Sequence, residues 1–139
     1  MIKKVHHIAI AVKNVDEAVK LYERLFNVKA GKVAVVPEQG VKAALIPIGE
    51  GGEIELLEPV DPSGGVAKFL ENRGEGIHHI CFEVDNLDKT LTDIIEKGGQ
   101  LIDKQGRKGL AGKIGFLHPR STKGVLIELA ETGESGNNK

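Results

Sequence analysis

Two histidine-containing segments of this chain are near copies of one another. Residues 6–16 read HHIAIAVKNVD and residues 78–88 read HHICFEVDNLD, with six of eleven positions identical at an offset of 72. Each is followed by a copy of Ile-Glu-Leu, at 54–56 and at 127–129. Each half therefore carries a histidine and, 48 or 49 residues later, a glutamate. Two imidazoles and two carboxylates related by a repeat are the donor set of one four-ligand metal site.

The alternation of side chains along a strand predicts which histidine of each adjacent pair faces that site. In the first segment His6 shares a face with isoleucines and a valine, whereas His7 shares the other face with two alanines. The second segment divides in the same way and separates His78 from His79. The bulky face must pack under a helix, so we expect the small-residue face to line a hollow. The residues predicted on that face are His7, Glu55, His79 and Glu128.

The other polar residues near these segments have ordinary structural explanations. We expect His6 and His78 to hydrogen-bond to helix or loop groups, and His118, just before a proline, to anchor a loop. Cys81 has no evident basic partner and is expected to be a packed thiol. Glu83 has two open interpretations, a base that supports the site or a rim residue in an ion pair.

The composition indicates a globular protein and gives no sign of a nucleic-acid or membrane partner. The net charge of −1 gives no reason to expect nucleic acid or an anionic membrane. No apolar run approaches the roughly 20 residues needed to span a bilayer. The N-terminal segment is a poor secretory signal, and the single cysteine fits a reducing compartment, so a cytoplasmic location is expected.

Each half of the chain reads as β-α-β-β-β. In the first half we expect a strand over about 4–12, a helix capped by Asn14 with Glu17 at its third position, and a hairpin of strands at 41–49 and 52–59. In the second half a strand at 77–84 precedes a helix that is capped by Asn86 and ends at Gly98, followed by strands at 99–104, 113–119 and 124–131. A short helix in 66–74 connects the halves. These elements predict a single domain, 1–139, made of modules 4–60 and 76–131 with a linker at 61–75.

The fold class expected from this order is α+β. Each crossover helix has one apolar stripe, so both should pack on one face of a mixed sheet and leave the other face free.

Several motifs make the chain resemble the vicinal oxygen chelate (glyoxalase-like) superfamily, and more closely its methylmalonyl-CoA epimerase family. They are HHIAIAV (6–12), PEQGV (37–41), IELLEP (54–59), GIHHICFEVDN (76–86) and FLHPRSTKGVLIEL (116–129). The resemblance implies paired βαβββ modules that form a cup-shaped, barrel-like mixed sheet with helices outside, and commonly a homodimer. It places the family's metal ligands on His7, Glu55, His79 and Glu128, the residues that the repeat selects.

The resemblance also implies an activity, interconversion of the (R) and (S) forms of methylmalonyl-CoA by proton transfer at C2. Two imidazoles and two carboxylates balance a divalent cation, and octahedral ligation leaves two positions for a bidentate CoA thioester that forms an enolate. Co²⁺ is favoured, with Mn²⁺, Ni²⁺ or Zn²⁺ as alternatives. Glu128 and Glu55 are the predicted acid/base residues. Some relatives carry a further catalytic glutamate where this chain has Ala43, so a second base is not fully specified.

Four basic residues near the end of the chain are candidates for binding CoA. Lys104, Arg107, Lys108 and Lys113 lie in a Gly-rich segment that either grips phosphates or is a solvated loop.

Three other functions share this scaffold. A glyoxalase I-type lyase/isomerase would act on a thiol adduct of an α-ketoaldehyde. A non-haem iron dioxygenase would need two histidines and one carboxylate, and a metal-free binding module would not need four ligands.

Overall fold

The computed structural model describes residues 1–103, 105–109 and 112–133 of the 139-residue chain. Contacts within the chain divide it into two compact units. The first unit is His7–His78, and the second unit comprises Met1–His6 together with His79–Lys139. The division falls close to the boundary between the predicted modules, and the organisation as a single domain stays a prediction.

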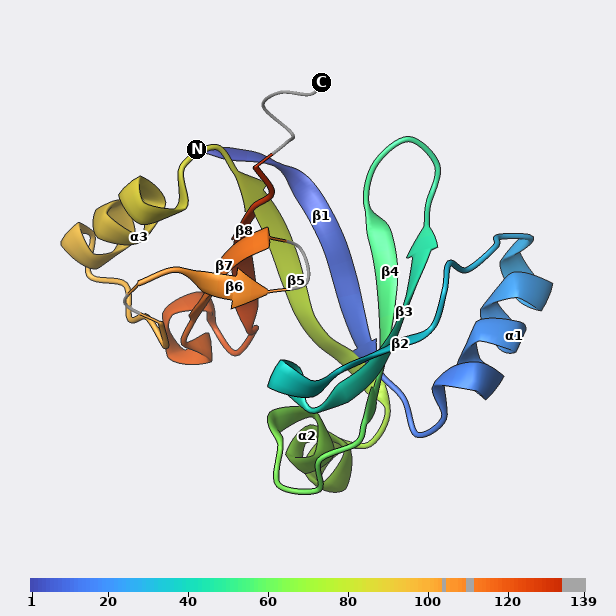
Figure 1. Cartoon of the computed structure of the whole chain (residues 1–139). Coiled ribbons are helices and arrows are strands. Elements are labelled where there is room, and N and C mark those ends of the chain that lie inside the picture. Colours follow the sequence, from blue (N-terminus) through green and yellow to red (C-terminus); the bar gives the residue numbers. More distant parts are fainter. Residues whose placement is uncertain (104, 110–111, 134–139) are drawn as a thin grey trace. The chain divides into compact units, whose positions relative to one another are not determined.

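The first unit contains the elements of one β-α-β-β-β module and the connecting helix (Figure 1). They are β1 (Ile2–Ala11, which enters this unit at His7), α1 (Val15–Phe26), β2 (Ala34–Val36), the 3₁₀ turn η1 (Pro37–Gln39), β3 (Val41–Pro47), β4 (Glu53–Pro59) and α2 (Gly65–Arg73). Its strands are ordered β2-β3-β4-β1, with β1 parallel to β4 and the other pairs antiparallel.

The second unit repeats this plan with β5, α3 and three further strands (Figure 1). The elements are β5 (Gly76–Val84, which enters this unit at His79), α3 (Leu87–Glu96), β6 (Arg107–Gly109), β7 (Gly112–Leu117), the 3₁₀ turn η2 (Pro119–Thr122) and β8 (Ile127–Glu131). The order is β5-β8-β7-β6, with β5 parallel to β8 and the other pairs antiparallel. The predicted α+β class is therefore confirmed.

The predicted helix ends are also confirmed. The Asn14 side chain accepts the N–H of Glu17, and the Asn86 side chain accepts the N–H of Lys89, so each asparagine caps its crossover helix. At the far end of α3, Gly98 has a φ of +91°, which a side chain would disfavour. The N–H of the next residue, Gly99, bonds to the Ile94 carbonyl at 2.8 Å and completes a Schellman motif.

A long-range glutamate bond begins both crossover helices. Glu58, in β4, accepts the N–H of Val15 at 2.8 Å, and Glu131, in β8, accepts the N–H of Leu87 at 2.8 Å. Carboxylates at helix N-termini satisfy exposed N–H donors and favour the helix dipole. The two bonds occupy repeat-related positions, so they are a property of the shared module.

The bulky face of each crossover strand packs under a helix, as the alternation predicts. In the first unit Val12, Val15, Ala44, Ile46 and Leu56 form the core beneath α1. In the second unit the equivalent core beneath α3 is formed by Val84, Leu87, Leu91, Leu117, Ile127 and Leu129. These cores fix the faces of the strands and hence the direction in which the other side chains point.

Two expectations about the small-residue faces and strands were wrong. The face of β1 that carries Ala9 and Ala11 is not free, because α2 packs on it through Val66 and its neighbours. Residues 99–103 are not a strand, since Leu101 makes only an isolated bridge to β7; Lys104 lies outside the described residues. The Asp103 carboxylate accepts the N–H of Phe116 at 2.9 Å, and this side-chain bond occupies a donor that a continuing strand would use.

Among the helices of the described residues, none is long and apolar enough to cross a membrane.

Candidate metal-binding and catalytic residues

In the first unit, His7 and Glu55 form a buried pair. The parallel pairing of β1 with β4 sets Ala9 opposite Glu55, and His7 lies two residues earlier on the same face of β1. The His7 Nε2 and Glu55 Oε1 atoms are 3.2 Å apart. Both residues are almost fully buried, at 3% and 4% exposure.

In the second unit, His79 and Glu128 form the corresponding pair. Cys81 lies opposite Glu128 in the parallel β5–β8 ladder, so His79 again lies two residues before the residue that faces the glutamate. The His79 Nε2 and Glu128 Oε1 atoms are 2.9 Å apart, and both residues are buried. The sequence repeat is thus also a repeat of register, and each predicted histidine meets its predicted glutamate.

The separations within both pairs suit ligation of a cation. Two adjacent ligands of an octahedral metal, each at about 2.1 Å, are about 3.0 Å apart. The observed separations of 2.9 and 3.2 Å lie on either side of this value. Buried carboxylates need a positive partner or strong hydrogen bonds, which a divalent cation held by imidazole and carboxylate groups would satisfy. The donor set in each unit therefore fits half of a two-histidine, two-glutamate site.

Apolar side chains surround the His79–Glu128 pair. Cys81, Ile114 and Ala130 form a buried cluster against which Phe116 packs. The Phe116 ring meets the His79 imidazole edge-on, with ring centroids 5.5 Å apart. This contact was not predicted from the sequence, although Phe116 lies directly opposite Glu128 in the β7–β8 ladder. Such a wall excludes water and restricts the rotation of the imidazole.

Glu83 takes part in an ion pair, which is one of its two predicted roles. Its carboxylate, 3% exposed as a residue, lies 3.4 Å from Lys3 Nζ and 3.9 Å from Lys4 Nζ. Both lysines lie at the start of β1, within Met1–His6, which belongs to the same unit as Glu83. Glu83 thus secures the N-terminal segment to β5.

The other histidines described here have structural contacts. His118 accepts the N–H of Arg120 through Nδ1 at 3.0 Å and caps η2, which confirms that it anchors a loop. The His78 ring meets Phe69 of α2 edge-on, with centroids 5.1 Å apart.

At the position where some relatives carry a catalytic glutamate, Ala43 is 4% exposed and packs in the small-residue core of the first unit. This position supplies neither an acid nor a base.

Of the four basic residues of the Gly-rich segment, the three that the structure describes do not share one face. Lys104 lies outside the described residues. Lys113 donates to Asp88 at 2.7 Å, and this hydrogen bond raises the pKa of the Lys113 ammonium above its usual value. Arg107 donates from Nε to Asp103 at 3.1 Å. The sequence could not separate these residues, because the strand positions of β6 were not recognised.

Comparison with known proteins identifies the family. The model of the Glyoxalase/Bleomycin resistance protein/Dioxygenase superfamily matches residues 6–117. The mitochondrial methylmalonyl-CoA epimerase of Homo sapiens is 33% identical over 130 residues, which are 92% of this chain and 73% of that protein. The chain belongs to the methylmalonyl-CoA epimerase family.

Solved structures agree with this assignment to the epimerase family. A methylmalonyl-CoA epimerase in complex with methylmalonyl-CoA and ammonium has a TM-score of 0.86 and 36% identity, over 93% of this chain and 94% of that chain. A hypothetical protein from Bacillus halodurans has a TM-score of 0.90 and 40% identity, over 97% of this chain and 98% of that chain. Both likenesses extend over nearly the whole chain.

Proposed function

We propose that this chain catalyses the epimerisation of methylmalonyl-CoA at C2. The observation that carries the proposal is the repeated, buried His–Glu pair, His7 with Glu55 and His79 with Glu128, at hydrogen-bonding separation. Membership of the epimerase family supplies the substrate, since the relatives carry this activity in their names. The reaction removes the C2 proton from one face of a carbon acid and adds a proton to the opposite face, so it needs a stabilised anion and carboxylates close to that carbon.

The four paired residues would together hold one divalent metal ion. Co²⁺ is favoured, with Mn²⁺, Ni²⁺ and Zn²⁺ as alternatives of the same ligand preference. When bound, such a cation acts as a Lewis acid toward the thioester carbonyl and carboxylate oxygens of the substrate. Two neutral imidazoles and two carboxylates bring a charge of −2, which matches the cation.

Glu128 would act as one general acid/base and Glu55 as the other. Each glutamate lies opposite the residue two places after its paired histidine, Glu55 in the first unit and Glu128 in the second. Both are buried. Deprotonation by one carboxylate and reprotonation by the other would invert C2. Because Ala43 has no ionisable group, Glu55 is the first candidate for the second role and Glu83 a weaker one.

Hydrogen–deuterium exchange at C2 of methylmalonyl-CoA in heavy water tests the function. Metal-loaded enzyme should exchange the C2 proton, and a chelator should abolish the exchange. Glu128→Gln should lower the exchange rate by about 10² to 10⁴, the usual contribution of a general acid/base. Glu131→Gln, on the opposite face of β8, is the matched control and should exchange at a wild-type rate. No exchange by the metal-loaded wild type would refute the epimerase function.

The assembly and location of the protein are also proposals. A homodimer follows the usual state of the superfamily, and sedimentation of the purified chain would measure it. The single buried Cys81 suits a reducing compartment, so we propose a cytoplasmic location, which fractionation of the source cells would test.

A further inference from the structure

Arg107 lies on the same face of its sheet as His79 and Glu128. In the antiparallel β6–β7 ladder Arg107 is opposite Ile114, which in turn is opposite Ala130 of β8. Residues directly opposite in a ladder point to the same face. Ile114 and Ala130 pack with Cys81 in the buried cluster that adjoins His79, so this row belongs to the ligand-bearing face.

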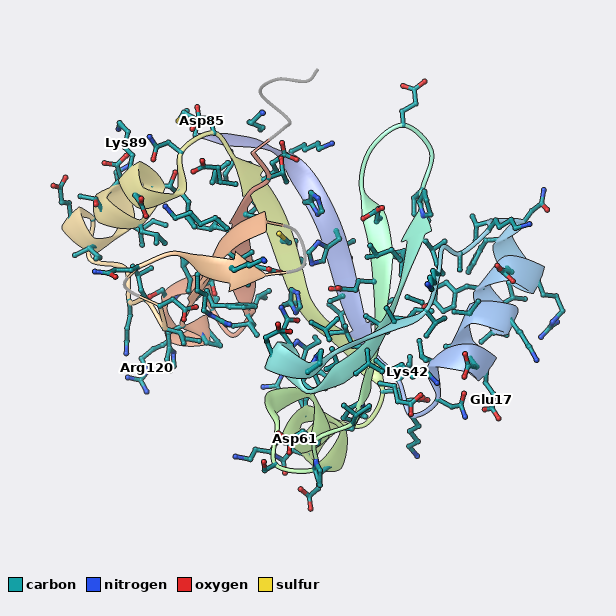
Figure 2. All side chains as sticks on the ribbon, viewed as in Figure 1. Glu17, Lys42, Asp61, Asp85, Lys89 and Arg120 are labelled. Atoms are coloured by element: carbon teal, nitrogen blue, oxygen red, sulfur yellow. The ribbon has the colours of Figure 1, made fainter. Side chains whose placement is uncertain are left out.

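The neighbouring Lys108 and Lys113 lie on the opposite face, and Lys113 makes a structural contact there. Lys108 is opposite Lys113 in the β6–β7 ladder, and Lys113 is opposite Glu131 of β8. The Glu131 carboxylate accepts the N–H of Leu87, the first residue of α3. The Lys113–Asp88 ion pair has a counterpart in the first unit, where Lys42 Nζ lies 3.1 Å from the carboxylate of Asp16, in the first turn of α1. Lys42 is labelled in Figure 2. A pair present in both modules serves the shared fold.

Two neighbours hold Arg107 in a defined position. Asp103, 17% exposed at its side chain, accepts the Arg107 Nε–H at 3.1 Å and is itself fixed by the N–H of Phe116. The guanidinium carbon lies 5.6 Å from the centre of the Phe116 ring, whose other neighbour is the His79 imidazole, with centroids 5.5 Å apart. The guanidinium is therefore within about 11 Å of that imidazole.

The outer part of the guanidinium is available to a ligand. The bond to Asp103 uses Nε–H, whereas four further N–H groups lie on the terminal nitrogens. The Arg107 side chain is 47% exposed. Such a fork binds carboxylate and phosphate oxygens with two parallel hydrogen bonds.

The arginine has no counterpart in the first unit. In the β2–β3 ladder Ala34 is opposite Ala43, as Arg107 is opposite Ile114, and Leu45 is opposite Glu55, as Phe116 is opposite Glu128. The metal-binding residues are repeated, yet a CoA thioester has no such symmetry. Features found in one module alone are those that can orient the substrate.

We propose that Arg107, positioned by Asp103 and Phe116, binds an anionic group of the thioester substrate. The group is the malonyl carboxylate or a phosphate of CoA, which share the chemistry that the guanidinium recognises. This inference rests on the proposed function and says which residue orients the substrate on the face that carries His79 and Glu128.

Steady-state kinetics of three variants test the inference. Arg107→Ala should raise KM for methylmalonyl-CoA about 10- to 100-fold, the loss expected for a charge-assisted hydrogen bond. Arg107→Lys, which keeps the charge but not the fork, should fall between this variant and the wild type. Lys108→Ala, an exposed cation on the opposite face, is the matched control and should keep KM within about twofold.

A truncated substrate separates the two sources of the anion. The methylmalonyl thioester of N-acetylcysteamine keeps the carboxylate and has no phosphate. An Arg107→Ala defect on both substrates identifies the carboxylate, and a defect on the CoA ester alone identifies a phosphate; either result supports the inference. The Co²⁺-induced rise in Tm should be unchanged in Arg107→Ala, since a merely structural role beside His79 would alter it.

An unchanged KM of Arg107→Ala on both substrates, with active wild-type enzyme, would overturn the inference and leave the epimerase function intact. Wild-type enzyme that fails to exchange the C2 proton would instead overturn the proposed function itself.

Discussion

The choice of His7 and His79 over the adjacent His6 and His78 can be tested by the effect of metal on thermal stability. The four single alanine variants form matched pairs, because neighbours on a strand point to opposite faces. For each variant the measured quantity is the difference between Tm with Co²⁺ and Tm with chelator. This difference cancels the effect of the substitution on the metal-free fold.

The expected shifts follow from binding linkage and chain length. Co²⁺ at about 100 times its Kd stabilises the folded state by about 2.7 kcal/mol. An unfolding entropy of about 2.1 cal/mol/K per residue gives about 290 cal/mol/K for 139 residues, so the wild-type Tm should rise by about 9 °C. Loss of a ligand that weakens binding about 100-fold leaves about 0.4 kcal/mol, or a rise of about 1 °C.

Differential scanning calorimetry at one protein and Co²⁺ concentration measures these shifts. We expect His7→Ala and His79→Ala to lose most of the 9 °C rise predicted for the wild type, and His6→Ala and His78→Ala to retain it. The assignment of faces would be wrong if His6→Ala lost as much as His7→Ala. The absence of any shift in the wild type would refute metal binding by these residues.

Three further predictions concern the fold. Glu58→Ala and Glu131→Ala each leave the first N–H of a crossover helix without its carboxylate acceptor. Each substitution should lower the free energy of unfolding by about 1–3 kcal/mol in urea titrations. A variant as stable as the wild type would contradict the shared capping role. Hydrogen bonds from the backbone and side chain of Ser63 hold the pKa of the Asp61 carboxyl below its ordinary value. The stabilising effect is therefore present above the ordinary carboxyl pKa and is lost as pH falls through the lowered one. In Ser63→Ala, carboxyl NMR titration should show a higher Asp61 pKa, and an unmoved pKa would disprove the cause. A Cβ at Gly112, where φ is +123°, would lie 2.6 Å from the Glu131 carbonyl oxygen of β8. Gly112→Ala should therefore lower the free energy of unfolding by at least about 1–3 kcal/mol, and a calorimetric Tm equal to that of the wild type would contradict this strain.

The repeat and the alternation of side chains made much of the candidate site predictable. His7 and His79 were selected because the bulky face of each strand must be buried under a helix. The alternation that separates the two faces can be read within a single strand. Asn14, Asn86 and Gly98 were predicted as helix ends for a similar reason, since capping depends on three or four consecutive residues.

Features that depend on pairing between distant strands were not predictable in this way. The hydrogen bond that the Phe116 N–H donates to the Asp103 carboxylate takes the place of a ladder bond to the strand expected at 99–104, and the sequence has no local signal for it. The packing of α2 on Ala9 and Ala11 was missed because a helix with a short apolar stripe does not indicate which face it will cover.

The sequence by itself determined the residues with metal-binding chemistry, because a repeat of 72 residues and a period of two are visible along the chain. Only the tertiary structure decided the register of β1 on β4 and of β5 on β8, which brings each imidazole to its carboxylate. It also decided that Arg107, and not Lys113, shares the face of Glu128, because the facing of a three-residue strand is fixed by its ladder partner. Side-chain chemistry is a local property of the sequence, whereas contact between strands is set by the packing of the whole module.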